Sequence, residues 1–190
     1  MTGSAPLRTR RAVLLAFFAA SLAGCNQKAI ESWLTQSDGS EGAGGSLYTE
    51  AAFSRAMAEL KKRAPSPIEA LSLLVYPDHA VLQARDPAAP KNVVQYVYRG
   101  GTVTPPVPVK LLGTGKLDDN LFPLESVKVA VVPKLSREAK AKANIPEGLV
   151  TRVLLKRNLP ESMDIQFRIF VTSQRRDATL DADQTGRLID

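Results

Sequence analysis

The clearest pattern in the chain is an alternation of apolar and other side chains in its C-terminal third. The apolar positions, two residues apart, are Met163, Ile165, Phe167, Ile169 and Val171. A period of two is typical of a strand with one buried face, so we expect these odd-numbered residues to face the core. By the same reasoning, Phe170 is expected on the opposite face of the sheet.

A helix followed by strands is expected in the first half of the chain. Apolar residues recur at three- and four-residue intervals between Ala52 and Leu60. Thr49 is a candidate N-cap for this helix, and Pro65 interrupts the pattern. Strand-like segments follow at residues 71–75, 80–85 and 93–98. The pair Gly100-Gly101 is typical of a hairpin turn, so we predict an antiparallel meander.

The second half repeats this order of elements. Helical segments are expected on either side of Pro133, with Ser136 as the N-cap of the second segment and Pro146 as its end. The expected strands are residues 149–155, the alternating segment described above, residues 178–180 and residues 188–189. A turn at Gly186 would connect the last two strands.

These patterns predict an α+β fold of two helix-plus-antiparallel-meander units in tandem. The first unit is expected to cover residues 47–109 and the second unit residues 124–190, with residues 110–123 as a linker between them. Residues 25–46 include a stretch rich in Gly and Ser with little to bury. They are therefore expected to form a flexible N-terminal tether.

The N-terminus has the pattern of an export signal. Three arginines within residues 8–11 precede the apolar residues 12–20, which are too few to span a bilayer. Residues 1–24 are therefore predicted to be a signal peptide. The sequence Leu22-Ala23-Gly24-Cys25 resembles a bacterial lipobox. This resemblance implies cleavage before Cys25, a diacylglyceryl group on its thiol and an acyl chain on its amine; the alternative is a membrane-spanning anchor followed by a chance cysteine.

The lipobox resemblance implies a cell-envelope protein held on a lipid bilayer by acylated Cys25. Asn26 follows the cysteine at the position where aspartate favours inner-membrane retention in many Gram-negative cells. The outer membrane is therefore favoured, with the inner membrane as the alternative. The segment Thr9-Arg10-Arg11-Ala12-Val13-Leu14 also resembles a twin-arginine signal, so export by Sec and export by Tat both stay open.

A helix and three or four antiparallel strands that end in a Gly turn, as at residues 183–188, are similar to PepSY-like and beta-lactamase-inhibitor-protein-like modules of bacterial envelopes. The resemblance covers residues 47–190 and is one of element order and of the turn. It implies a non-catalytic binding or inhibitory module, although a fold by itself does not determine function.

The amino-acid composition limits which disulfide, metal and nucleic-acid-binding sites the chain can form. The chain has 190 residues with one cysteine and one histidine, which excludes an internal disulfide framework and disfavours Cys- or His-ligated metal sites. Without residues 1–24, 22 basic and 19 acidic side chains remain, a formal charge of +3. This charge is small for a protein that binds phosphate backbones, so we expect no nucleic-acid partner.

Few residues are suited to catalysis. His79 provides the sole imidazole, and we expect it in an exposed turn beside Asp78. Residues 181–186 resemble the start of a calcium loop, but a hairpin turn rich in Asp and Gly is the preferred interpretation. The sequence contains no Gly-x-Ser-x-Gly pattern. We therefore expect no catalytic residue, no metal and no cofactor.

The remaining features favour a binding surface, because aromatic residues beside cations on a sheet face are typical of protein contacts. By alternation, either Tyr96 and Tyr98 or Val93 and Val97 face outward. The candidate surface residues are Tyr96, Tyr98, Arg152, Arg168 and Phe170. Alternatively, the two units pack sheet to sheet, or helices cover both faces.

The predicted function is that of an envelope lipoprotein acting as a non-catalytic protein-binding, adaptor or inhibitor-like module. Its partner would be an unidentified envelope protein. Two other classes stay open: a carrier of small apolar ligands or lipids, which would use the same apolar residue types, and an unrecognised hydrolase.

Overall fold

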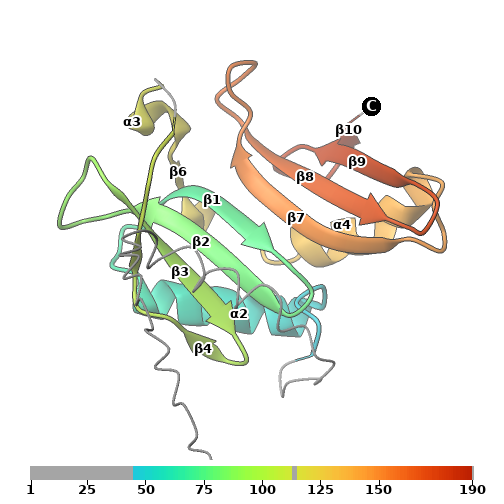
Figure 1. The fold of residues 1–190 in the computed structure, drawn as a ribbon, viewed down its shortest axis with the longest axis horizontal. Coiled ribbons are helices and arrows are strands. Elements are labelled where there is room, and N and C mark those ends of the chain that lie inside the picture. The colour runs from blue at the N-terminus through green and yellow to red at the C-terminus, as the bar shows by residue number, and fades with distance from the viewer. Residues whose placement is uncertain (1–44, 113–114, 190) are drawn as a thin grey trace, which may run out of the picture. The chain divides into compact units, whose positions relative to one another are not determined.

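The computed structural model describes residues 45–112 and 115–189. The predicted signal peptide, Cys25 and almost all of the predicted tether therefore lie outside the described residues. Within these ranges, helices and antiparallel strands form a mixed fold dominated by the sheet (Figure 1), which confirms the α+β class. No helix in the same ranges is long and apolar enough to cross a membrane.

The two long helices and the main strands follow one another in the predicted order, and β5, α3 and β6 are additional elements that the sequence analysis did not predict. The first half contains α2 (Glu50–Arg63), β1 (Glu69–Val75), β2 (His79–Arg85), β3 (Val93–Arg99), β4 (Thr102–Val103) and β5 (Val107–Val109). A connecting stretch contains α3 (Leu117–Asn120), β6 (Phe122–Pro123) and a 3-10 turn (Leu124–Ser126). The second half contains α4 (Val131–Lys142), β7 (Leu149–Arg157), β8 (Ile165–Thr172), β9 (Asp177–Ala182) and β10 (Leu188–Ile189).

The first helix begins as the sequence predicts. Thr49 has an extended backbone, and its side chain accepts a hydrogen bond from the Ala52 amide at 3.4 Å. Glu50 lies in the first turn and three basic residues lie in the last turn, which complements the helix dipole. The predicted N-cap is confirmed.

The second helix differs from the prediction. The predicted break at Pro133 is wrong, because α4 is continuous and Pro133 lies in its first turn, where a backbone N–H needs no partner within the helix. Ser136 is therefore inside the helix rather than at its N-cap. Its hydroxyl donates a hydrogen bond to the Pro133 carbonyl at 2.9 Å.

All strands belong to one antiparallel sheet in the described part of the chain. Its order is β10-β9-β8-β7-β1-β2-β3-β4, with β5 also paired to β3 and β6 paired to the start of β1. The two halves meet where β1 pairs with β7. At this seam Leu73, Leu74 and Val75 lie opposite Leu155, Leu154 and Val153. Strands from both halves therefore share the same two sheet faces.

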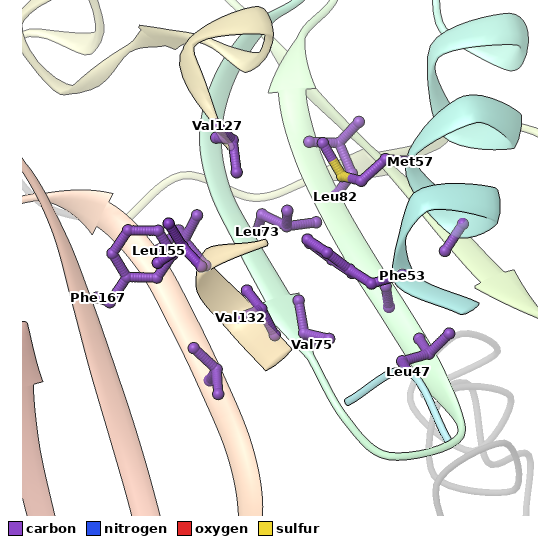
Figure 2. Close-up of a cluster of buried hydrophobic side chains, with 14 of the residues drawn as sticks. Leu47, Phe53, Met57, Leu73, Val75, Leu82, Val127, Val132, Leu155 and Phe167 are labelled. Carbon is purple, nitrogen blue, oxygen red and sulfur yellow. The ribbon is translucent and has the colours of Figure 1, made fainter. Parts of the chain in front are cut away.

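One hydrophobic cluster lies between the sheet and the two long helices. Figure 2 shows Phe53 and Met57 of α2, Val132 of α4, and side chains from strands of both halves gathered in this cluster. Leu155 and Phe167 belong to it and are almost fully buried. Because both helices bury side chains in the same cluster, they lie on the same side of the sheet (Figure 1). The other face is left uncovered by α2 and α4.

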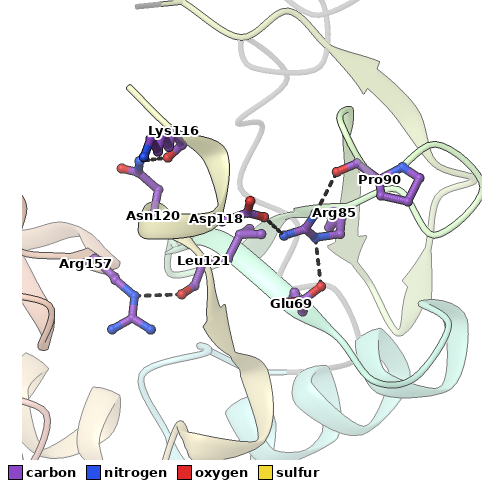
Figure 3. Close-up of polar contacts among 8 residues, drawn as sticks. All are labelled: Glu69, Arg85, Pro90, Lys116, Asp118, Asn120, Leu121 and Arg157. Atoms are coloured by element: carbon purple, nitrogen blue, oxygen red, sulfur yellow. Dashed lines mark hydrogen bonds and ion pairs between the residues drawn. The ribbon is translucent and has the colours of Figure 1, made fainter. Parts of the chain in front are cut away.

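The residues predicted as a linker are held against the sheet by two arginines (Figure 3). The Arg85 Nε lies 2.8 Å from a Glu69 carboxylate oxygen, and the same guanidinium contacts the Asp118 carboxylate. The Arg157 Nε donates a hydrogen bond to the Leu121 carbonyl at 2.7 Å. These contacts fix α3 at the end of the sheet where β1 begins and β2 ends.

Candidate functional site

The face of the sheet opposite the core carries a second set of side chains, and we call it the open face. Its members on β7 and β8 are Arg152, Leu154, Lys156, Gln166, Arg168 and Phe170. Its members on β1, β2 and β3 are Leu74, Val81, Gln83, Gln95, Val97 and Arg99. All of these are half-buried or exposed, whereas most of the residues next to them in the strands are buried in the core.

The predicted alternation in the C-terminal third is confirmed for β8. Ile165, Phe167, Ile169 and Val171 are all buried in the core. Phe170 lies on the open face and is half-buried. Met163 is the exception, because it precedes the strand and is 50% exposed.

The prediction that Tyr96 and Tyr98 form an exposed surface is wrong. Their side chains are only 2% and 4% exposed and belong to the core cluster. Burial raises the pKa of the Tyr96 hydroxyl. The residues of β3 that face outward are Gln95, Val97 and Arg99. The two tyrosines therefore contribute to the fold and are not part of the open face.

Arg152 and Phe170 are directly opposite each other on β7 and β8. The Arg152 guanidinium carbon lies 4.0 Å from the centroid of the Phe170 ring. Such a cation–π contact at an accessible site contributes about 0.5–1 kcal/mol. The structure therefore brings these two predicted surface residues together and leaves the guanidinium edge available for a further contact.

Arg168, the third predicted residue on this face, has an acidic partner. Its Nε and one terminal nitrogen lie 2.8 Å and 3.0 Å from the two Asp181 carboxylate oxygens. This two-point ion pair is half-exposed and links β8 to β9. The charge of Arg168 is consequently neutralised within the fold, which makes it a weaker recognition element than Arg152.

A second cluster on the open face is missing from the sequence prediction. His79 is 7% exposed, so the expectation of an exposed turn histidine is wrong. The Tyr76 ring stacks on its imidazole with centroids 4.2 Å apart and planes 9° apart. His79 Nδ1 lies 2.7 Å from an Asp78 carboxylate oxygen. Arg99 lies 3.2 Å from the other Asp78 oxygen.

The two clusters are neighbours across the seam. The β1–β7 ladder ends at the pair Val75–Val153; Tyr76 follows Val75 and Arg152 precedes Val153 in the chain, so both residues lie just beyond this pair. His79 pairs with Arg99 across β2 and β3. One line of side chains across four strands and the β1–β2 turn therefore consists of Phe170, Arg152, Tyr76, His79 and Arg99. We call this line the aromatic-cationic row.

An apolar line runs beside the aromatic-cationic row, and we call it the apolar row. The strand register aligns Leu154 with Leu74, Leu74 with Val81, and Val81 with Val97. All four side chains are half-buried. Aliphatic side chains next to aromatic and arginine side chains are a composition typical of protein interfaces.

Two cations on β7 are uncompensated. Among residues 45–112 and 115–189, neither Arg152 nor Lys156 has an ion-pair partner. They lie on the same face of the strand, on either side of Leu154. The centre of the open face therefore has positive charge available to an acidic ligand.

The environment of His79 sets its protonation. Burial lowers the pKa of the His79 imidazole, and Arg99 adds to this effect, while Asp78 opposes it. Burial alone would raise the pKa of the Asp78 carboxyl, but its hydrogen bond with His79 and the charge of Arg99 lower it overall. Near neutral pH we therefore expect a neutral imidazole beside an ionised Asp78, with His79 Nδ1 within 3.0 Å of both an Asp78 carboxylate oxygen and a terminal nitrogen of Arg99.

Acidification is expected to destabilise the protein through His79. The unfolded state binds the proton at the ordinary histidine pKa of about 6.5, whereas the folded state binds it only at lower pH. This contribution to stability is therefore fully present above about pH 6.5 and decreases as the pH falls below that value. Urea unfolding at about pH 8 and about pH 5.5 measures it, with His79→Gln as the comparison. Parallel pH dependence in both proteins would contradict this assignment.

Two surface depressions elsewhere in the described structure are weaker candidates for a binding site. A surface depression of about 320 Å³ is lined by Arg63, Asp86, Val94, Tyr96 and four prolines. A polar depression of about 570 Å³ is lined by Glu147, Gln174 and Arg175. Across the two described ranges, no group of three or more His, Cys, Asp or Glu side chains is placed to hold a metal ion.

Comparisons with known proteins found no match: no family model, no curated protein and no solved structure is significantly similar to this chain.

Proposed function

We propose that this protein is a lipid-anchored envelope lipoprotein whose open face binds a partner protein without catalysis. The observation that carries the proposal is the aromatic-cationic row beside the apolar row, on a face that α2 and α4 leave uncovered. Arg152 and Lys156 have no ion-pair partner in the part of the chain that the structure describes, and their charges favour a partner surface that carries carboxylates. We therefore expect binding to weaken as the salt concentration rises.

The anchoring part of the proposal rests on the lipobox resemblance at Cys25. Acylated Cys25 would hold the chain on the bilayer, with the outer membrane favoured, after export by Sec or Tat. A flexible tether over residues 25–46 would have a typical reach of about 25 Å. Such a tether confines the domain near the membrane and raises its local concentration toward an envelope partner.

We also infer that residues 47–109 and 124–190 are tandem helix-plus-meander units. The order α2-β1-β2-β3-β4, followed by α4-β7-β8-β9-β10, supports this inference. The pairing of β1 with β7 joins the first strand of each half. In the proposed arrangement, the partner contacts both units at once, because the aromatic-cationic row crosses their seam.

Charge reversal at Arg152 tests the binding surface. Arg152→Glu is expected to reduce capture of the partner about tenfold or more, because it breaks the contact with Phe170 and repels partner carboxylates. Chemical crosslinking in intact cells, followed by quantitative mass spectrometry of the purified protein, measures this capture. Arg137→Glu, at an exposed position on α4, is the matched control and should leave capture unchanged.

Equal losses with both variants, or no loss with either, would contradict binding through the open face. Co-purified lipid without a protein would favour the carrier alternative. Turnover of a generic ester or glycoside by the purified protein would favour the hydrolase alternative.

A further inference from the structure

We propose that a phospholipid bilayer surface contacts the protein through Leu111 and Leu112, with Lys110 and Lys116 on the headgroup phosphates. Leu112 is 86% exposed and Leu111 is 42% exposed. Both lysines are exposed, and in the described part of the chain neither has an ion-pair partner. Single exposed apolar residues are common on protein surfaces, but two adjacent leucines between lysines form a pattern typical of membrane contact.

The leucines belong to a longer exposed apolar stretch. Pro105, Pro106, Val107 and Pro108 are also exposed, and Lys110 is the one charged residue between position 105 and position 112. Exposure of such an apolar stretch to water is unfavourable, and this cost is removed when another apolar surface covers the stretch.

The described residues that flank the leucines on both sides are held at one end of the sheet. On the N-terminal side, β5 pairs with β3, with Val109 opposite Val93. On the C-terminal side, α3 is held by the contact between Arg85 and Asp118 (Figure 3). The leucines therefore lie near the sheet end that carries α3, with their side chains exposed.

The surface of a bilayer is a more favourable environment than water for the two leucines and the two lysines. Transfer of leucine side chains from water to the boundary of headgroups and acyl chains is favourable. The flexible aliphatic part of each lysine allows its ammonium group to reach the phosphates. Asp119 is exposed nearby and opposes a strongly anionic surface. Insertion of the leucines is therefore the main driving force, and the lysines contribute mainly to orientation.

The leucines can contact the same bilayer that holds acylated Cys25. The inference therefore rests on the proposed anchoring at Cys25. The Leu47 amide donates to the Pro77 carbonyl at 2.7 Å, so the described chain begins near the β1–β2 turn, at the opposite end of β1 from α3. β1 is about 23 Å long by its seven residues. Nineteen residues lie between Cys25 and Gly45, and the twenty Cα–Cα steps span up to about 65 Å when extended, which is enough for both contacts on one bilayer.

A fluorophore at position 112 tests the inference in the full-length, lipidated protein. Cys25 is the sole natural cysteine, so Leu112→Cys adds one labelling site when Cys25 is acylated. The protein is reconstituted in vesicles of phosphatidylethanolamine and phosphatidylglycerol, with and without brominated acyl chains. We expect the bromine to quench an environment-sensitive label at position 112 roughly twofold or more. Ser54→Cys, at an exposed position on α2, is the matched control and should not be quenched.

Leu111→Asp in the Leu112→Cys background is expected to abolish the quenching, because a charge beside the label opposes insertion. An unquenched label at position 112 in vesicle-bound protein would overturn the inference. A blue shift of the label without vesicles would also overturn it, since a second copy of the chain would then cover the leucines. The mass of Cys25 with its acyl chains is measured separately, so a failure of the anchoring proposal is distinguishable from a failure of this one.

Discussion

Replacing Phe167 with aspartate is expected to abolish the cooperative fold of the described region. Phe167 is 1% exposed and belongs to the cluster that includes side chains of α2, α4 and strands of both halves. Truncating a buried phenylalanine costs about 3–5 kcal/mol, and burying an unpaired carboxylate adds several more. Because small domains are stable by about 5–15 kcal/mol, this change removes most or all of the stability.

Phe170→Asp on the same strand is the matched control for this prediction. Its side chain lies on the open face, and the new carboxylate would face Arg152. We expect a loss below about 1 kcal/mol. Far-ultraviolet circular dichroism and urea unfolding measure both variants. Similar tolerance at the two positions would show that the assignment of core and open faces is wrong.

Replacing Cys25 with serine is expected to eliminate acylation completely, because the thiol that would accept the diacylglyceryl group is lost. Each buried methylene of an acyl chain contributes about 0.8 kcal/mol to membrane binding, so several chains make anchoring stable. The direct measurement is metabolic incorporation of a palmitate analogue, together with the mass of the N-terminal peptide.

The wild-type protein should incorporate the analogue and begin at Cys25, and the serine variant should do neither. Fractionation of the wild-type protein on a density gradient would then distinguish the outer from the inner membrane. Analogue incorporation that persists in the variant, or an unmodified wild-type Cys25, would contradict the lipobox interpretation.

Local patterns were sufficient to predict most elements. Thr49 and the apolar spacing after it indicate α2, and the alternation around Phe167 indicates β8 with its buried face. Pro133 was misinterpreted because proline breaks a helix in its interior but is tolerated in its first turn. Because α4 already begins at Val131, Ser136 lies inside the helix and does not cap it.

The sequence of β3 contains a signal for which of its faces is outward. Gln95 and Arg99 share the parity of Val93 and Val97, so two polar residues mark this set as outward. The aromatic-cationic row was harder to predict. It depends on the pairing of β1 with β7, two strands that lie far apart in the sequence.

The burial of His79 was not predictable from the neighbouring sequence. Pro77 and Asp78 are typical turn residues, so the sequence predicts an exposed turn at this point. The Tyr76 ring stacks on His79 within the β1–β2 turn, and the pairing of β2 with β3 adds Arg99 to the cluster.

The central claim is that a partner protein binds the open face, and site-specific photocrosslinking tests it most directly. A photoreactive amino acid is placed at position 170 on the open face and, in a separate strain, at the exposed position 137 on α4. After irradiation of intact cells, we predict a discrete protein adduct from position 170 that is absent from position 137. Adducts of equal yield from both positions, or adducts to lipid alone from position 170, would contradict the claim.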